Sequence, residues 1–145
     1  MQEVSRSELI DYFEKVDDLF PTPLSAKESL QVLAEKLLKY GTLCQEFDNG
    51  KMVGLVAGYT ENAVNNLGYI SVVSVLPVKQ GEGIASKLVK KFLSIAKKKG
   101  LHGVNLYCDR RNDHALKMYE RLGFEKYILA GEPRPKDEHL VYWFN

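Results

Sequence analysis

The chain has 145 residues, of which 45% are hydrophobic and 27% are charged, and its formal net charge is +1. This length and composition are ordinary for one soluble globular domain covering residues 1–145. The near-neutral charge gives no general attraction to nucleic acid or to an anionic membrane, so we expect neither as a partner.

The sequence also favours a reducing, cytoplasmic setting. No signal peptide opens the chain, and no apolar run is long enough to span a bilayer. Cys44 and Cys108 both lie in apolar, strand-like stretches. We therefore expect buried thiols and not a disulfide, a metal pair or a nucleophile.

Two helices are predicted at the start of the chain. The first covers Ser5–Phe20, and the two prolines of Phe20–Leu24 interrupt it because proline cannot continue the hydrogen-bond ladder. Ser25 then has the position of an N-cap, and Glu28, three residues on, completes a capping box. The second helix is expected to extend to about Tyr40.

The rest of the chain alternates between strand and helix patterns. Asn49-Gly50 is a strong two-residue hairpin signal, and Gly68–Leu76 is apolar on both faces, as in a central, covered strand. The remaining predictions are strands over Thr42–Phe47, Lys51–Tyr59 and Gly103–Asp109, helices over Gly81–Lys99 and Asn112–Leu122, and a final antiparallel pair, Phe124–Leu129 and His139–Phe144, around the loop Gly131–Glu138.

This element order predicts an α+β (mixed α/β) fold. About four helices would flank a central, mainly antiparallel sheet, because most strands follow one another through short connections. Only the strands on either side of the Gly81–Lys99 helix need a parallel crossover.

The segment from Val75 to Ser86 is the most informative part of the sequence. It places a glycine-bearing turn between a predicted strand and a helix N-terminus, where backbone N–H groups and the helix dipole bind anions, above all phosphate. Gly81 and Gly83 have no Cβ, so a phosphate can come close to the main chain. The chain contains no P-loop, and Gly81-x-Gly83-x-x-Ser86 fails the last position of the dinucleotide fingerprint.

The same segment resembles the acetyl-CoA signature of the GNAT superfamily of acetyltransferases, Gln/Arg-x-x-Gly-x-Gly/Ala. Gln80, Gly83 and Ala85 occupy its three defining positions. The later run Asn112-x-x-Ala115-x-x-x-Tyr119-x-x-x-Gly123-Phe124 resembles the superfamily's other common block. The resemblance covers roughly residues 42–145, whereas the first 40 residues match only in being two helices.

The resemblance implies acetyl-CoA as the acyl donor, no metal, and a sheet that is splayed at the cofactor site. Backbone groups around Val73 and Val75 would pair with the pantetheine arm, near a β-bulge, and one N–H would stabilise the oxyanion. The pyrophosphate would bind to main-chain N–H groups of the turn formed by Gln80, Gly81, Glu82, Gly83, Ile84, Ala85 and Ser86.

Two side chains of the second block would complete this site. In the superfamily the residue at Tyr119 protonates the leaving thiolate, a role that suits a phenol. The alternative is a core tyrosine packed beside Leu122 and Phe124. Asn112 lies seven residues before Tyr119, on the same helical face, and would be an N-cap that also bonds the pantetheine arm.

The general base stays open, because the central strand contains no Glu or Asp. Glu61, Asp109, Glu138 and His139 lie near strand ends and could act through water, or a water chain alone could remove the proton.

The expected acceptor walls are Asp17–Pro23 and Gly131–Glu138. Asp17 and Asp18 could hold a cationic acceptor or be plain helix-end charges. One aromatic side chain of the last hairpin could stack on an acceptor or lie in a dimer contact, the candidates being Tyr142, Trp143 and Phe144.

The resemblance therefore favours acetyl transfer from acetyl-CoA to a primary amine of a small molecule, such as an amino sugar, by direct attack in a monomer or homodimer. One alternative is a non-catalytic acyl-CoA-binding or regulatory module, and another is an acetyltransferase with a protein acceptor. The near-neutral charge disfavours an enzyme acting on tRNA or ribosomal protein.

Overall fold

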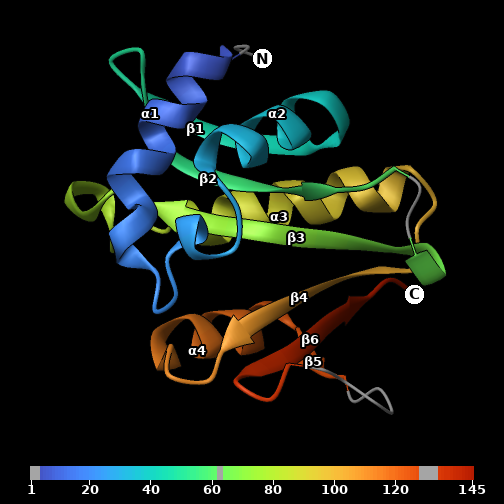
Figure 1. The fold of residues 1–145 in the computed structure, drawn as a ribbon. Helices are drawn as coiled ribbons and strands as arrows, with labels where there is room; N and C mark the ends of the chain where they lie inside the picture. Colours follow the sequence, from blue (N-terminus) through green and yellow to red (C-terminus); the bar gives the residue numbers. More distant parts are fainter. Residues whose placement is uncertain (1–3, 62–63, 128–133) are drawn as a thin grey trace.

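The computed structural model describes residues 4–61, 64–127 and 134–145. Within these residues one sheet has six strands in the order β1-β2-β3-β4-β6-β5 (Figure 1). Their bounds are β1 (Thr42–Asp48), β2 (Lys51–Tyr59), β3 (Leu67–Val75), β4 (Gly103–Asp109), β5 (Glu125–Lys126) and β6 (Asp137–Trp143). Every neighbouring pair is antiparallel except β3 and β4, which confirms the predicted mixed sheet with one parallel crossover.

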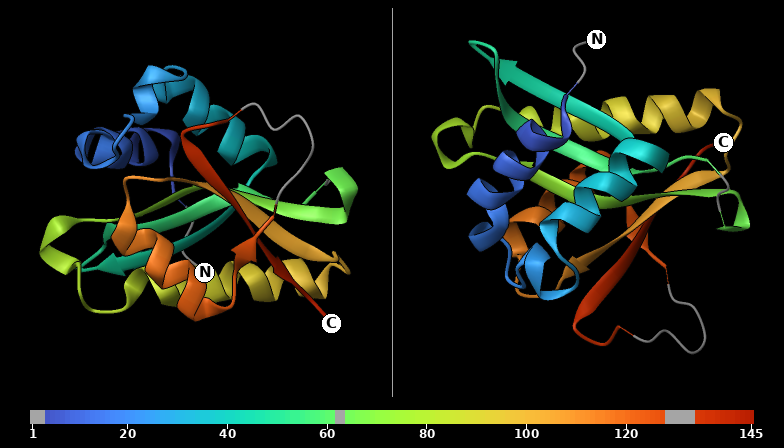
Figure 2. Two further views of the ribbon diagram at one scale, coloured as in Figure 1. Left: turned by 90° about the horizontal axis from the view of Figure 1, so that it is seen from below. Right: turned by 45° about the horizontal axis from the view of Figure 1, so that its top comes forward.

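Helices cover the sheet on both faces. α1 (Arg6–Val16) and α2 (Leu30–Tyr40) pack on one face, and α3 (Ile84–Lys98) and α4 (Asp113–Leu122) pack on the other (Figure 2). Each face has its own apolar core, because side chains point alternately to either side of a strand. β3 contributes Val72 to the first core and Ile70 and Val75 to the second, so it is the central, covered strand that its sequence predicts.

The first hairpin forms as predicted. Asn49 and Gly50 join β1 to β2 with positive φ angles of 52° and 77°. Those angles are the ones that a two-residue turn of this kind needs, and both residue types adopt them readily.

The predicted start of the second helix is wrong. Ser25 lies in a short 3₁₀ helix, Leu24–Ala26, where its hydroxyl donates a hydrogen bond to the Asp17 carboxylate (2.5 Å). The N-cap of α2 is Ser29, whose hydroxyl accepts from the Val32 N–H (3.1 Å). The Ser25 N–H and hydroxyl both donate to the ionised Asp17 carboxylate, and Ser29, the next serine, accepts from an N–H of the first helical turn instead.

The first helix is also shorter than predicted. α1 has a capping box between Ser5 and Glu8 and ends at Val16, after which Asp17–Leu19 forms a 3₁₀ turn.

Three further boundaries differ from the sequence-based expectation. α3 begins at Ile84 and not at Gly81, because Gly81 and Gly83 have φ angles of 86° and 80°, which an α-helix cannot contain. β5 covers only Glu125–Lys126, and the end of its predicted range lies outside the described residues. β6 begins at Asp137, two residues before the predicted start.

Candidate active site

β3 and β4 separate halfway along their length. Their parallel pairing begins at Leu67 and Gly103 and ends at Ile70 and Leu106. β3 nevertheless continues to Val75. The sheet is therefore splayed beyond Ile70, and a gap opens between the carboxyl-terminal halves of two neighbouring strands.

A β-bulge marks the point where the strands part. Ala57 of β2 lies opposite Val72 and Gly58 lies opposite Ile70, so Ser71 is an extra residue in β3. A bulge bends its strand and increases the local twist. A Cβ at Gly58 would lie 1.9 Å from the Tyr69 carbonyl oxygen, so the close approach of β2 at the bulge requires glycine.

The edge of β3 beyond the bulge presents backbone groups to the gap. The Leu76 N–H donates to the Val53 carbonyl of β2 (2.8 Å). Backbone groups alternate in direction along a strand, so those of Val73 and Val75 point away from β2 and toward the gap. The Gln80 side-chain amide donates to the Val75 carbonyl (3.2 Å), which ties the following turn to this edge.

The turn after β3 leaves the N-terminus of α3 open. Gly83 is the N-cap and has no side chain to accept from the first N–H groups of the helix, and the intrahelical ladder starts with Lys87 N–H donating to the Gly83 carbonyl (3.1 Å). A Cβ at Gly81 or Gly83 would meet no protein atom within 4 Å. The turn therefore presents N–H groups that pair with no other described residue, with open space in the same place, as an anion requires.

A cleft of about 860 Å³ runs through the gap. Glu82 is the one predicted cofactor residue that does not line it, and it lines a smaller pocket beside Lys79 and Lys87 instead. The other predicted cofactor residues all line the cleft, namely Val73, Val75, Gln80, Gly81, Gly83, Ile84, Ala85, Ser86, Asn112 and Tyr119.

Tyr119 and Asn112 of the α4 segment lie on the cleft wall. The Asn112 side chain accepts from the Ala115 N–H (3.2 Å) and so is the predicted N-cap. Tyr119 is 5% exposed, lies edge-on to Phe124, and has a pKa raised by burial, so it keeps its proton at neutral pH. Among hydrogen bonds between described residues, none uses the Tyr119 hydroxyl.

Cys108 lines the cleft and Cys44 does not. Both thiols are free and buried, as predicted, and burial raises their pKa values to about 12 and about 11 respectively. Thiols with such pKa values are protonated at neutral pH and are poor nucleophiles.

None of the four candidate bases offers a free basic group to the cleft. Asp109 lines it, but two hydrogen bonds from the Arg111 guanidinium (2.7 and 3.0 Å) lower its pKa to about 2. Glu61 pairs with Lys99 and is not on the lining.

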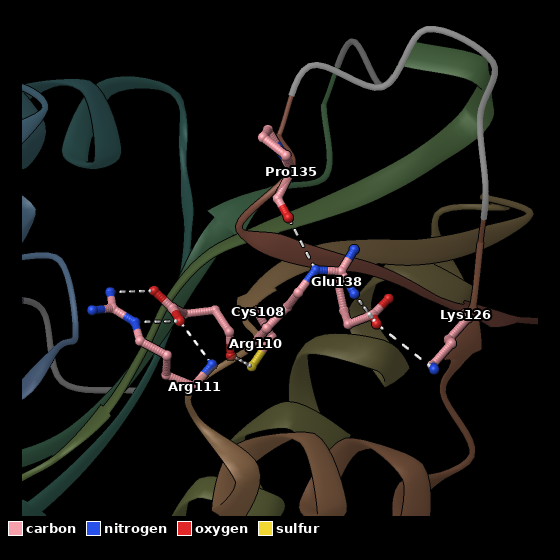
Figure 3. Close-up of polar contacts among 7 residues, drawn as sticks. Cys108, Arg110, Arg111, Lys126, Pro135 and Glu138 are labelled. Carbon is pink, nitrogen blue, oxygen red and sulfur yellow. Dashed lines mark hydrogen bonds and ion pairs between the residues drawn. The ribbon is translucent and has the colours of Figure 1, made fainter.

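Glu138 and His139, the other two candidates, are not on the cleft lining. The Glu138 carboxylate is paired with Arg110, which also donates to the Pro135 carbonyl (3.0 Å), and lies 3.7 Å from Lys126 (Figure 3). His139 is buried, stacks on Tyr107, and its Nε2 bonds to the Asn105 side chain (2.8 Å).

The other half of the cleft lies where the acceptor walls were expected, because described residues of both Asp17–Pro23 and Gly131–Glu138 line it, but the side chains singled out as acceptor contacts do not. Neither Asp17 nor Asp18 is on the lining, and Asp17 instead accepts from the backbone and side chain of Ser25. The last-hairpin aromatics, Tyr142, Trp143 and Phe144, are not on the lining either. The lining residues on this half are Phe20, Pro21, Thr22, Lys27, Tyr69, Ser71, Tyr107, Asp109, Arg134, Lys136 and Asp137, which we call the acceptor half.

Sequence reasoning missed Tyr107 and Lys27 on this wall. The signal for Tyr107 was present, because it alternates with the buried Leu106 and Cys108 and so had to face the opposite side of β4.

The described residues contain no group of three His, Cys, Asp or Glu side chains that could hold a metal ion. In the same part of the chain, no helix is long and apolar enough to cross a membrane.

Comparison with known proteins shows the family to which this chain belongs. A sequence model described as the acetyltransferase (GNAT) family matches residues 7–124. N-alpha-acetyltransferase 30 of Schizosaccharomyces pombe is 32% identical over 82 residues, which is 55% of each chain. A mycothiol acetyltransferase of Arthrobacter is 39% identical over 61 residues, 42% of this chain and 19% of that protein. The chain thus spans only part of the length of these curated relatives.

Solved structures share the whole fold. A PaiA N-acetyltransferase of Thermoplasma acidophilum in complex with coenzyme A superimposes with a TM-score of 0.75 at 16% sequence identity, over 99% of this chain and 97% of that one. At this identity the likeness concerns the fold alone.

Proposed function

Because the chain belongs to the acetyltransferase (GNAT) family, we propose that it transfers the acetyl group of acetyl-CoA to a primary amine of a small molecule. The observation that carries the proposal is the splay between β3 and β4. It combines backbone groups of the β3 edge, the N-terminus of α3 with its glycine N-cap, and the Tyr119 side chain on the walls of one cleft.

The residues of the cleft suit a long, thioester-bearing anion. The N–H groups of the Gln80–Ser86 turn would hold a pyrophosphate through the main chain. Backbone groups of Val73 and Val75 would pair with an extended amide-containing arm as a neighbouring strand does, and one such N–H would polarise the thioester carbonyl. Bound acetyl-CoA supplies the activated acetyl group and a thiolate that must be protonated.

Tyr119 is proposed as the general acid. Its raised pKa keeps the phenol protonated, and its hydroxyl has no competing partner among the described residues. The interpretation as a plain core residue is compatible with its contact with Phe124, so only the hydroxyl distinguishes the two roles.

The acceptor amine is proposed to lose its proton to water in the cleft. The Asp109 pKa of about 2 makes that carboxylate a weak base, and the other candidate bases are not on the lining. Direct attack then needs the neutral amine, so the rate should rise with pH toward the amine pKa.

Replacement of Tyr119 by Phe tests the general-acid role. We expect kcat to fall about 100-fold or more, since general acid catalysis contributes roughly 10²–10⁴-fold, whereas the Kd of acetyl-CoA stays nearly unchanged. The assay is thiol release together with the mass of the acetylated product. Tyr142→Phe is the matched control, because Tyr142 packs against the same Phe124 and is not on the cleft lining. If Tyr119→Phe retains the wild-type kcat, Tyr119 is not the acid.

A peptide α-amine is the second candidate acceptor. The match to N-alpha-acetyltransferase 30 favours it, because that protein's name describes transfer to α-amines. The same assay separates the two by comparing short peptides with free amines. Acetyl-CoA binding without acetylation of any acceptor would instead favour an acyl-CoA-binding module.

A further inference from the structure

The acceptor half of the cleft has an excess of positive charge. Lys27, Arg134 and Lys136 line it, and no ion pair between described residues involves any of the three. Two carboxylates lie on the same wall. Asp109 is compensated by Arg111, which leaves Asp137 as the only acidic side chain there without an ion pair within the described residues. The balance of these groups is positive, and a charged ligand in this half would be attracted if it were anionic.

Arg134 is held in a defined orientation. Its guanidinium carbon lies 4.2 Å from the centre of the Tyr107 ring, so the Tyr107 face supports the planar cation. A guanidinium stacked in this way keeps its edge N–H groups available, and those groups match the two oxygens of a carboxylate or phosphate.

The backbone around Arg134 is also fixed. The Arg134 carbonyl accepts from the Asp137 N–H (3.2 Å), and the Arg110 N–H donates to the Lys136 carbonyl (3.0 Å). The Arg110 side chain adds its bonds to Pro135 and Glu138 (Figure 3). This segment therefore holds Arg134 against the end of β4. Ligand binding then costs little conformational entropy at Arg134, because its backbone is already ordered.

We propose that the acceptor carries a carboxylate or phosphate group besides its amine, and that Arg134 binds this anionic group. The inference rests on the proposed function, since it names the substrate class for the same cleft. Lys27 and Lys136 add attraction without a fixed geometry, because lysine is a flexible point charge. A polyamine would be repelled by the same three cations, and Asp17 and Asp18, which could have held a cationic acceptor, lie off the lining.

Binding to the CoA-loaded protein tests the proposal independently of turnover. The probes are matched pairs of primary amines, namely β-alanine with β-alaninamide and glucosamine 6-phosphate with glucosamine, with spermidine as the polycation. Calorimetry should give at least about ten-fold tighter binding for the anionic members of the carboxylate or the phosphate set, because a charge-assisted bidentate contact is lost in the neutral partner.

Arg134→Gln should abolish that preference, and Arg134→Lys should retain part of it. The matched control is Arg6→Gln, because Arg6 is exposed, pairs with Glu35 of α2, and neither residue lines the cleft. Acetyl-CoA affinity should be unchanged in all three variants.

The outcomes separate this proposal from the proposed function. Arg134-dependent binding of anionic amines without acetylation would support the anion site and contradict the transferase activity. Acetylation of neutral amines with no effect of Arg134→Gln would support the transferase activity and contradict the anion site. Equal binding of spermidine, no preference within the pairs, or no binding of any anionic probe would overturn the anion site.

Discussion

The Asp109 carboxylate ends β4 on the wall of the cleft, where Arg111 holds it in the ionised form. Its folded pKa of about 2 lies below the ordinary value, so the pair stabilises the folded state above about pH 4. As the pH falls from about 4 through about 2, the carboxylate is protonated first in the unfolded state and then in the folded state, so this contribution is progressively lost.

Asp109→Asn should therefore lower the free energy of unfolding at neutral pH by less than about 1 kcal/mol, because the pair lies close to solvent. The difference from wild type should shrink between about pH 4 and pH 2 and vanish below that. Urea unfolding across this range measures it. Arg111→Gln should show the same pH dependence of the stability difference, whereas a difference that keeps its full neutral-pH size at about pH 2 would contradict the ion-pair explanation.

Single residues also explain which parts of the site could be read from the sequence. Gln80, Gly83 and Ala85 act through neighbouring backbone atoms, so their spacing alone predicts where an anion binds. Arg134 and Tyr107 meet only because β6 pairs with β4, and no local pattern encodes that contact. The same holds for Gly58, whose role in the bulge depends on its distance from Tyr69 of the next strand.

At the scale of elements, the strands follow from their sequence more closely than the helix ends do. Alternation and the Asn49-Gly50 turn predict β1 and β2 with almost correct bounds. The N-terminus of α2 depends on a choice between Ser25 and Ser29, both of which have the side chain of an N-cap. The choice is made by the Asp17 carboxylate, which lies eight residues before Ser25.

Ser29→Ala tests this assignment. Loss of the cap should lower the free energy of unfolding by about 1 kcal/mol, since the Val32 N–H loses its acceptor. Ser29→Asp should retain wild-type stability, because aspartate caps helices equally well. Chemical denaturation measures both variants. If Ser29→Ala unfolds at the wild-type denaturant concentration, Ser29 is not an effective cap.

At the scale of the molecule, the two faces of one sheet contribute different parts of the cleft. The face under α1 and α2 carries the acceptor half through Phe20, Lys27 and Tyr107, and the other face supplies the α3 N-terminus and Tyr119. The splay of β3 from β4 opens a passage between the two faces, so donor and acceptor can meet from opposite sides of the sheet. This arrangement explains why one cleft includes residues from β3, β4, β6, α3 and α4 and from connecting segments.

The central claim is that the turn before α3 holds acetyl-CoA, and one calorimetric titration of acetyl-CoA tests it most directly. Gly83→Ala and Gly100→Ala are compared with wild type, because both glycines have positive φ angles (80° and 81°) and open space around a new Cβ. Both variants should therefore lose similar stability, but Gly100 ends α3 far along the chain from the turn. We predict at least about ten-fold weaker acetyl-CoA binding for Gly83→Ala, a loss of about 1.4 kcal/mol, and wild-type affinity for Gly100→Ala. Equal affinity in all three proteins, or no binding by wild type, would contradict the account.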